Sequence, residues 1–170
     1  VVGEDTATTV VPGQKLRLRI AATASVATFQ NKRLRLQYQA GATSTGFWRN
    51  VGVVGGTDAE AIKAGFDNPS VADGANVATL VLTGSTKAES YVENNPSALM
   101  PNALAVNDVG EWDFTIFTAS AAPSTAYYFR LYNETDGIYL DGYTIYPKLV
   151  TTPQYNFPSQ TQNSFNVADG

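Results

Sequence analysis

The sequence predicts an all-β fold, an antiparallel β-sandwich, and three observations support that prediction. Apolar and polar residues alternate with period two over several short stretches, which is the spacing of a strand with one buried face. Gly, Pro, Asn, Asp and Ser cluster between those stretches, as they do in turns. Long amphipathic helical patterns are missing from the sequence, and parallel sheets need such helices as crossovers between their strands.

Five strands are expected in the first half of the chain. In residues 15–20, Leu16, Leu18 and Ile20 alternate with three cations, and residues 33–38 repeat that Arg-Leu arrangement. Each stretch therefore predicts a strand with one face on the core and one in solvent. The other expected strands are a Thr- and Val-rich first strand within 1–12, a short strand at 48–54 and a buried strand at 77–82.

Three more strands are expected in the second half. Residues 111–116 alternate cleanly, with Trp112, Phe114 and Ile116 directed inward, and residues 127–132 direct Tyr127, Phe129 and Leu131 inward. A turn at 133–137 follows, because Asp-Gly is a strong hairpin signal between such stretches. The last strand is expected at 142–149, with Pro147 marking a strand end or a sheet edge. The one helical turn expected lies at 58–64.

The segments at the two ends differ in character from the middle. We expect an N-terminal extension or donor strand at residues 1–12, a sandwich domain at 13–150 and an extended C-terminal tail at 151–170. The tail contains Pro153 and Pro158, and when extended its roughly 20 residues span about 66 Å. Because the chain starts at Val1 rather than Met, we expect a secreted chain after signal-peptide removal; an excised piece of a longer chain is the alternative.

Composition excludes several classes of function. The 170 residues include no histidine and no cysteine, which excludes a Ser-His-Asp triad, a cysteine nucleophile and ordinary zinc or haem sites. The net charge of −4, with 11 basic against 15 acidic residues, argues against nucleic-acid binding. Apolar runs stay well short of the ~20 residues of a membrane span. We therefore expect no nucleic-acid partner and no membrane span.

Acidic residues give no sign of a catalytic or metal site. Glu89 with Glu93, and Glu111 with Asp113, are the candidate carboxylate pairs for glycoside hydrolysis, and their spacing shows nothing beyond chance. Glu111 and Asp113 are expected to share the solvent face of one strand. Asp73-Gly74 reads as a turn, because EF-hand spacing for calcium is missing. We expect no enzyme activity and no cofactor.

The exposed aromatic residues allow two interpretations. Tyr128, Tyr132, Tyr139 and Tyr146 are expected opposite the core faces of their strands, where cross-strand packing is their simplest role. The alternative is an aromatic stripe that contacts a sugar or another subunit, and Trp48 fits either role. Asn133-Glu134-Thr135 is an N-glycosylation sequon in a turn expected to be exposed, which makes Asn133 a candidate glycosylation site.

Three strand motifs resemble a known family. They are Arg33-Leu34-Arg35-Leu36-Gln37-Tyr38, then Tyr128-Phe129-Arg130-Leu131-Tyr132, and finally Leu140-Asp141-Gly142-Tyr143-Thr144-Ile145-Tyr146-Pro147. Together they resemble a poorly characterised Ig-like β-sandwich module that is often repeated in large secreted surface proteins of uncultured bacteria. The resemblance covers residues 4–149, including Glu4-Asp5-Thr6 and Trp48, and implies an Ig-like or jelly-roll-like sandwich. Two cysteines frequent in the family are missing here, so the resemblance implies no disulfide.

The resemblance also implies an extracellular structural or adhesive module without catalytic residues. Because this chain holds one copy and a tail, we expect it to form long objects by polymerising into a pilus-like filament or surface assembly. The expected mechanism is strand complementation between subunits. The candidate donor residues are Thr6, Thr8, Val10 and Val11 at the N-terminus, slightly favoured, and Tyr155, Phe157, Phe165 and Val167 at the C-terminus. The alternatives are a monomeric carbohydrate-binding or adhesive module, or a viral capsid or tail decoration domain.

Overall fold

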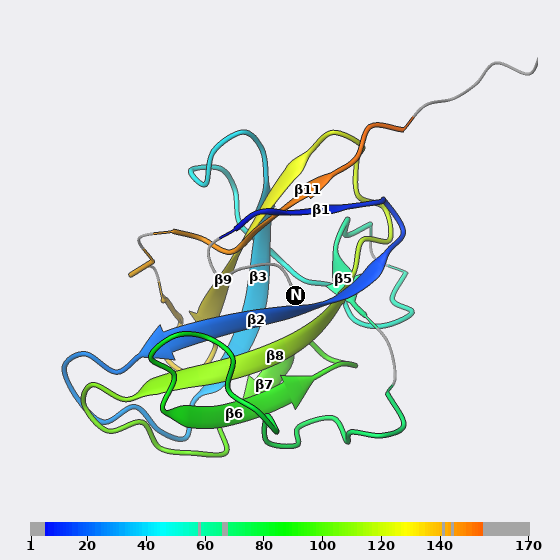
Figure 1. Ribbon diagram of the computed structural model, residues 1–170. Helices are drawn as coiled ribbons and strands as arrows, with labels where there is room; N and C mark the ends of the chain where they lie inside the picture. Colours follow the sequence, from blue (N-terminus) through cyan, green and yellow to red (C-terminus); the bar gives the residue numbers. More distant parts are fainter. Residues whose placement is uncertain (1–5, 58, 66–67, 141, 144, 155–170) are drawn as a thin grey trace, which may run out of the picture.

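The protein is a sandwich of two β-sheets, which confirms the all-β prediction. Figure 1 shows the computed structural model, which describes residues 6–57, 59–65, 68–140, 142–143 and 145–154. Within these ranges the chain forms eleven strands and no helix. The strands are divided between a seven-stranded and a four-stranded sheet, and the core lies between them.

The seven-stranded sheet holds both terminal strands at one edge. Its order is β1-β11-β9-β3-β4, and the short strands β10 and β7 extend the sheet beside β9 and β3. All its pairs are antiparallel except β1 with β11, which run parallel with Thr8 opposite Leu149 and Val10 opposite Thr151. The bounds are β1 Thr8–Val10, β3 Arg33–Ala40, β4 Arg49–Asn50, β7 Ser97–Leu99, β9 Ala126–Asn133, β10 Ile138–Tyr139 and β11 Lys148–Thr151.

The four-stranded sheet is built around one long central strand. In this sheet β8 (Val109–Phe117) pairs on one side with β2 (Lys15–Thr23), antiparallel over all nine residues. On its other side β8 pairs with β5 (Lys63–Ala64) antiparallel and with β6 (Lys87–Val92) parallel. Strand β2 is therefore an edge strand, with β8 as its single partner in the described part of the chain.

The core consists of the inward rows that the sequence alternation predicts. Trp112, Phe114 and Ile116 of β8 are at most 1% exposed, and Phe129 and Leu131 of β9 are fully buried against them. At about 25 cal/mol per Å² of buried apolar surface, such rows are the main stabilising contribution of a disulfide-free domain. The predicted strands at 15–20, 33–38, 111–116 and 127–132 are confirmed as parts of β2, β3, β8 and β9.

The predictions fail where tertiary contacts decide the local structure. Residues 77–82 form a loop rather than a buried strand, and the strand nearby is β6, whose sequence includes the buried Glu89. Of 58–64, the described residues 59–64 contain β5 instead of a helical turn. The last strand is β11, which begins after Pro147 instead of at residue 142, because proline has no N–H to donate to a ladder.

Candidate functional site

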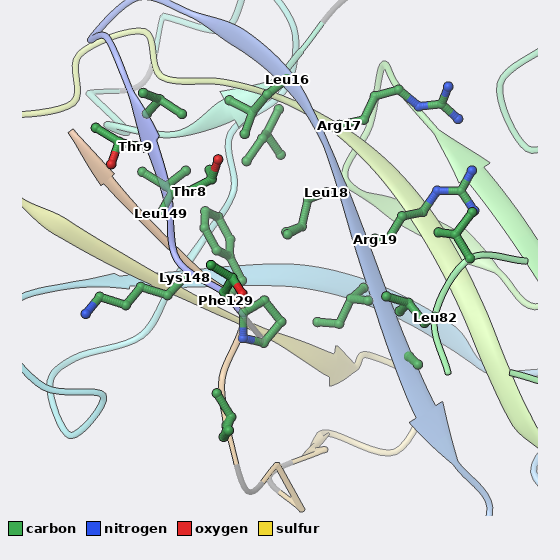
Figure 2. A pocket seen from close by; sticks show the side chains of 18 of the residues that line it. Thr8, Thr9, Leu16, Arg17, Leu18, Arg19, Leu82, Phe129, Lys148 and Leu149 are labelled. Atoms are coloured by element: carbon green, nitrogen blue, oxygen red, sulfur yellow. The ribbon is translucent and has the colours of Figure 1, made fainter. Parts of the chain in front are cut away.

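A groove lies between the open edges of the two sheets. Strand β1 ends one sheet and β2 ends the other on the same side of the sandwich, since only residues 11–14 connect them. Between them is a hollow of about 880 Å³ that is open to solvent, which we call the edge groove (Figure 2). It runs along β2 from Gln14 to Ala21, roughly 26 Å at the rise of a strand.

The lining of the edge groove is mainly apolar. Leu16 and Leu18 of β2 point into it and are only half-buried, and Phe129 and Leu149 of the facing sheet form a buried floor (Figure 2). The rest of the lining is Thr6, Thr8, Thr9, Val10, Gln14, Arg17, Arg19, Ile20, Ala21, Val81, Leu82, Ile116, Tyr143, Ile145, Pro147 and Lys148. A half-buried leucine row beside a hollow leaves apolar surface that a further strand could cover.

The backbone of β2 carries unused hydrogen-bonding groups on the side of the edge groove. Thr118 N donates to Gln14 O at 3.0 Å and Ala24 N donates to Asp108 O at 3.1 Å, so even-numbered residues of β2 face β8. In an antiparallel ladder the residues between them direct their N–H and C=O to the other side. Within the described residues, the backbone groups of Arg17, Arg19 and Ala21 have no partner on that side.

The outer face of β2 is fixed by ion pairs with β8. Arg19 Nη1 donates to Glu111 Oε1 at 2.5 Å and its Nη2 lies 3.0 Å from Asp113 Oδ2. Arg17 Nε donates to Asp113 Oδ1 at 3.2 Å. Glu111 and Asp113 do share one face, but the prediction that this face is in solvent is wrong, because they are 0% and 1% exposed. In Figure 2 both arginines point away from Leu16 and Leu18, so these ion pairs leave the apolar side of β2 open.

Two of the four N-terminal donor candidates lie in a strand of the chain's own sandwich. Thr8 and Val10 lie in β1, paired in parallel with β11, and Val10 is only 4% exposed. Thr6 lines the edge groove, and Val11 is exposed in the turn that leads to β2. Part of segment 1–12 is therefore a strand of the same sandwich.

The C-terminal donor candidates Tyr155, Phe157, Phe165 and Val167 lie outside the described residues. The chain leaves the sandwich beside β1, where Thr152 N donates to Val10 O at 2.8 Å. This exit is at the end of the molecule where β2 begins, because β1 and β11 run in the same direction and residues 11–14 lead from Val10 to β2. The sixteen residues that follow Gln154 thus start close to one end of the edge groove.

The candidate aromatic residues pack around a buried arginine. The guanidinium carbon of Arg130 lies 4.3 Å from the ring centre of Trp48 and 3.8 Å from that of Tyr139. Tyr132 packs on Tyr139 at 5.5 Å and Tyr146 on Trp48 at 5.4 Å. These contacts agree with the simpler of the two interpretations, in which the aromatic residues pack against one another. They also occupy ring surface that a bound sugar would need. Tyr128, apart from them, donates to Ala42 O at 3.0 Å.

The sequon asparagine is not accessible in the folded chain. Asn133 is 0% exposed, so the expectation of an exposed sequon is wrong. Its Nδ2 donates to Asp136 Oδ2 at 2.7 Å, and its Oδ1 accepts from the backbone N–H of Thr135 and Asp136. Asn133 therefore closes the turn before β10, in which Gly137 adopts a φ of 70°. Hydrogen bonds from Lys32 and Asn133 lower the pKa of Asp136.

The remaining acidic residues serve separate structural roles. Glu93 accepts from Tyr91 Oη at 2.9 Å and from Asn68 N at 2.7 Å, and Asp73 Oδ1 accepts from Glu93 N at 3.0 Å. Burial raises the pKa of Glu89 to about 7. Across the described ranges, no group of three or more acidic residues could hold a metal ion.

The leucine row of β2 can be recognised in the sequence, but the open edge beside it cannot. Alternation shows that Leu16 and Leu18 share a face, and only the strand order shows that this face borders an open edge. Among the described residues, no helix is long and apolar enough to cross a membrane. Comparison of the chain with models of protein families, with curated proteins and with solved structures finds no match.

Proposed function

We propose that this chain is an extracellular structural subunit that assembles into a pilus-like filament or surface array by β-strand complementation. The observation that supports the proposal is the edge groove, where a nine-residue edge strand presents half-buried leucines and unpaired backbone groups to the same hollow. Edge strands in natural sheets are normally short, charged or covered, because a long uncovered edge pairs with other chains. In β2 the charged side chains, Arg17 and Arg19, lie on the face opposite to Leu16 and Leu18 and leave the open edge unprotected.

A strand added along β2 would satisfy both requirements of the groove. Its backbone would pair with the outward N–H and C=O groups of β2, and its alternate side chains would cover Leu16 and Leu18. When the added strand comes from another subunit, the contact joins two different surfaces. Such a contact repeats without closing and generates a filament. Low charge and the resemblance to surface modules support an extracellular location.

The carbohydrate-binding alternative receives less support from the aromatic residues. Trp48 and Tyr139 have their rings against Arg130, and each also contacts a further tyrosine. A sugar platform needs ring faces open to solvent, and these contacts take up part of that ring surface, although Tyr139 is 56% exposed. The filament is therefore the better supported of the two functions.

The test is assembly of the 170-residue chain and of one edge-blocking variant. Negative-stain electron microscopy and light scattering should show regular filaments at high protein concentration. Ala21→Pro removes one backbone N–H that faces the groove, and the hydrogen bonds between β8 and the even-numbered residues of β2 remain. We therefore expect this variant to form no filaments. Ala21→Ser keeps the N–H and should assemble normally. Circular dichroism of each variant checks that the sandwich is retained.

Two results would contradict the proposal. One is a monodisperse wild-type monomer of about 18 kDa at high concentration. The other is a folded Ala21→Pro protein that forms filaments as long as those of Ala21→Ser. The first result would direct attention to glycan binding by a monomeric module.

A further inference from the structure

The edge groove needs a donor segment with two apolar side chains on one face. Leu16 and Leu18 are two residues apart on β2, and a strand paired with β2 places its own alternate residues against them. The lining of the groove includes the basic residue Lys148 and no acidic residue, whereas Arg17 and Arg19 point away and are paired with Asp113 and Glu111. The donor should therefore be apolar at two alternate positions and carry no positive charge.

The N-terminal segment does not meet these requirements. Its strand-forming part, β1, is already paired with β11 of the same chain. The five residues that precede Thr6 are Val1, Val2, Gly3, Glu4 and Asp5. Their two apolar residues are adjacent, so they would point to opposite faces of a strand, and the glycine weakens a strand further.

The C-terminal segment meets them. In residues 163–168, Phe165 and Val167 are two apart and alternate with Ser164, Asn166 and Ala168. The six residues span about 20 Å when extended, which fits within the groove's roughly 26 Å. From residue 152 onward the sequence contains no Lys or Arg, and its one charged residue is Asp169. That carboxylate would follow the donor strand directly, in a groove whose lining includes Lys148 and no acidic residue.

The linker favours donation to a second copy. Between Gln154 and residue 163 lie eight residues, 155–162, whereas the exit of the chain at Thr152 is already beside the start of its own groove. Pro153 and Pro158 favour extended backbone at and just before their own positions, and eight extended residues would span roughly 25 Å at about 3.1 Å per residue. An extended linker carries the donor away from its own groove and towards a neighbour's.

We infer that residues 163–168 of a second copy of this chain fill the edge groove, pairing with the free edge of β2 and inserting Phe165 and Val167 over Leu16 and Leu18. This inference rests on the proposed function, and it names the donor that the function requires. Ser164, Asn166 and Ala168 then lie on the outer face of the extended sheet, the face that also carries Arg17.

Disulfide trapping tests the inference directly, because the sequence contains no cysteine. One chain carries Arg17→Cys, at a half-exposed position that is opposite Asn166 whichever way the donor runs, and three others carry Ser164→Cys, Asn166→Cys or Ala168→Cys. Directly opposed residues on neighbouring strands have Cβ atoms ~5 Å apart, close enough for a disulfide. After mixing and mild oxidation, we expect at least one of the three pairs to form a mixed dimer on a non-reducing gel. Adding Phe165→Asp and Val167→Asp to the donor chain should remove that dimer.

Matched controls identify other occupants. Val2→Cys mixed with Arg17→Cys should give no mixed dimer, and a mixed dimer there would show an N-terminal donor and overturn the inference. A chain with both Arg17→Cys and the reactive tail cysteine should give a ladder of multimers. If it gives only a cross-linked monomer, the tail fills its own groove, and donation to a second copy is wrong.

Failure of the inference and failure of the proposed function give different results. Filaments of wild-type protein with no cross-link at any tail position would leave the function standing and overturn the C-terminal donor. A wild-type chain that stays monomeric and gives no cross-link would overturn both. In excess, a synthetic peptide of residues 161–170 should shorten growing filaments, and the same peptide with Asp at positions 165 and 167 should not. Equal filament lengths with the two peptides would count against the inference.

Discussion

Arg19 on the edge strand donates a hydrogen bond to the fully buried carboxylate of Glu111 on β8, at 2.5 Å. The same carboxylate accepts from the backbone N–H of Val81 at 3.0 Å and of Leu82 at 2.9 Å. Glu111 therefore fastens the 77–82 loop to the outer face of the sheet and holds Arg19 away from the groove. Glu111 thus keeps the outer face of β2 covered, and by holding Arg19 on that face it leaves the face with Leu16 and Leu18 open.

Removing that carboxylate should destabilise the domain strongly. Glu111→Ala leaves the guanidinium of Arg19 and two backbone N–H groups without their acceptor, at a cost of roughly 3–5 kcal/mol. Glu111→Gln keeps an acceptor oxygen and should cost less. Urea denaturation followed by tryptophan fluorescence measures both. Equal midpoints for wild type and Glu111→Ala would show that the loop is held by other contacts.

Stability should fall as pH rises from about 5 to 8. Glu89 is fully buried, and its two oxygens form no standard hydrogen bond within the described residues. Burial raises its pKa to about 7, which the backbone amide of Asn102 and the ammonium of Lys87 only partly oppose. The folded state therefore holds a proton that the unfolded state releases near pH 4.5, so ionisation above pH 7 costs about 3 kcal/mol.

Glu89→Gln should remove most of this pH dependence. The amide has nearly the same shape and does not ionise, so the variant should be more stable than wild type at pH 8. Denaturant midpoints at pH 5 and pH 8 compare the two proteins. A wild-type midpoint that is higher at pH 8 than at pH 5 would contradict the prediction.

The aromatic cluster should contribute measurably to stability. Trp48→Ala removes the ring that lies against Arg130 and Tyr146, and the loss should be about 1–2 kcal/mol. The adjacent Phe47 is 82% exposed, so Phe47→Ala is the control and should change stability by less than about 0.5 kcal/mol. Thermal unfolding by circular dichroism checks both. If the two variants unfold at the same temperature, the Trp48 ring does not contribute measurably to stability.

Gly110 should tolerate no side chain. A Cβ atom there would lie 2.9 Å from the Trp112 ring and 3.0 Å from both Glu89 and Leu104, all in the core. Gly110→Ala should therefore cost about 1–3 kcal/mol. Gly142 has open space around its Cβ position, and Gly142→Ala should be neutral or slightly stabilising. Chemical denaturation of the two variants side by side tests the contrast.

Period-two alternation was sufficient to locate the four strands that dominate the fold. Leu16 and Leu18, or Trp112 and Phe114, identify a face because strand geometry permits no other arrangement. Alternation cannot show what covers the opposite face. Glu111 and Asp113 looked solvated for that reason, although the 77–82 loop and two arginines cover them.

The strand β6 and the edge groove could not be read from local pattern. Lys87–Val92 places Glu89 in the core, where polarity predicts exposure, and the apolar run at 77–82 forms the loop instead. The groove depends on strand order: β2 borders it because β8 alone pairs with β2 in the described chain. Pairing partners are set by long-range contacts, which no window of sequence contains.

The parallel pairing of β1 and β11 also determines how the domain resists stretching. If the chain is pulled from its two ends, β1 is drawn towards its start and β11 towards its end, in opposite directions along their shared ladder. The hydrogen bonds between Thr8–Val10 and Lys148–Thr151 lie across that direction and share the load, so they must break together rather than one after another. A domain held by the two ends of its chain would therefore meet tension with a mechanical clamp at this ladder.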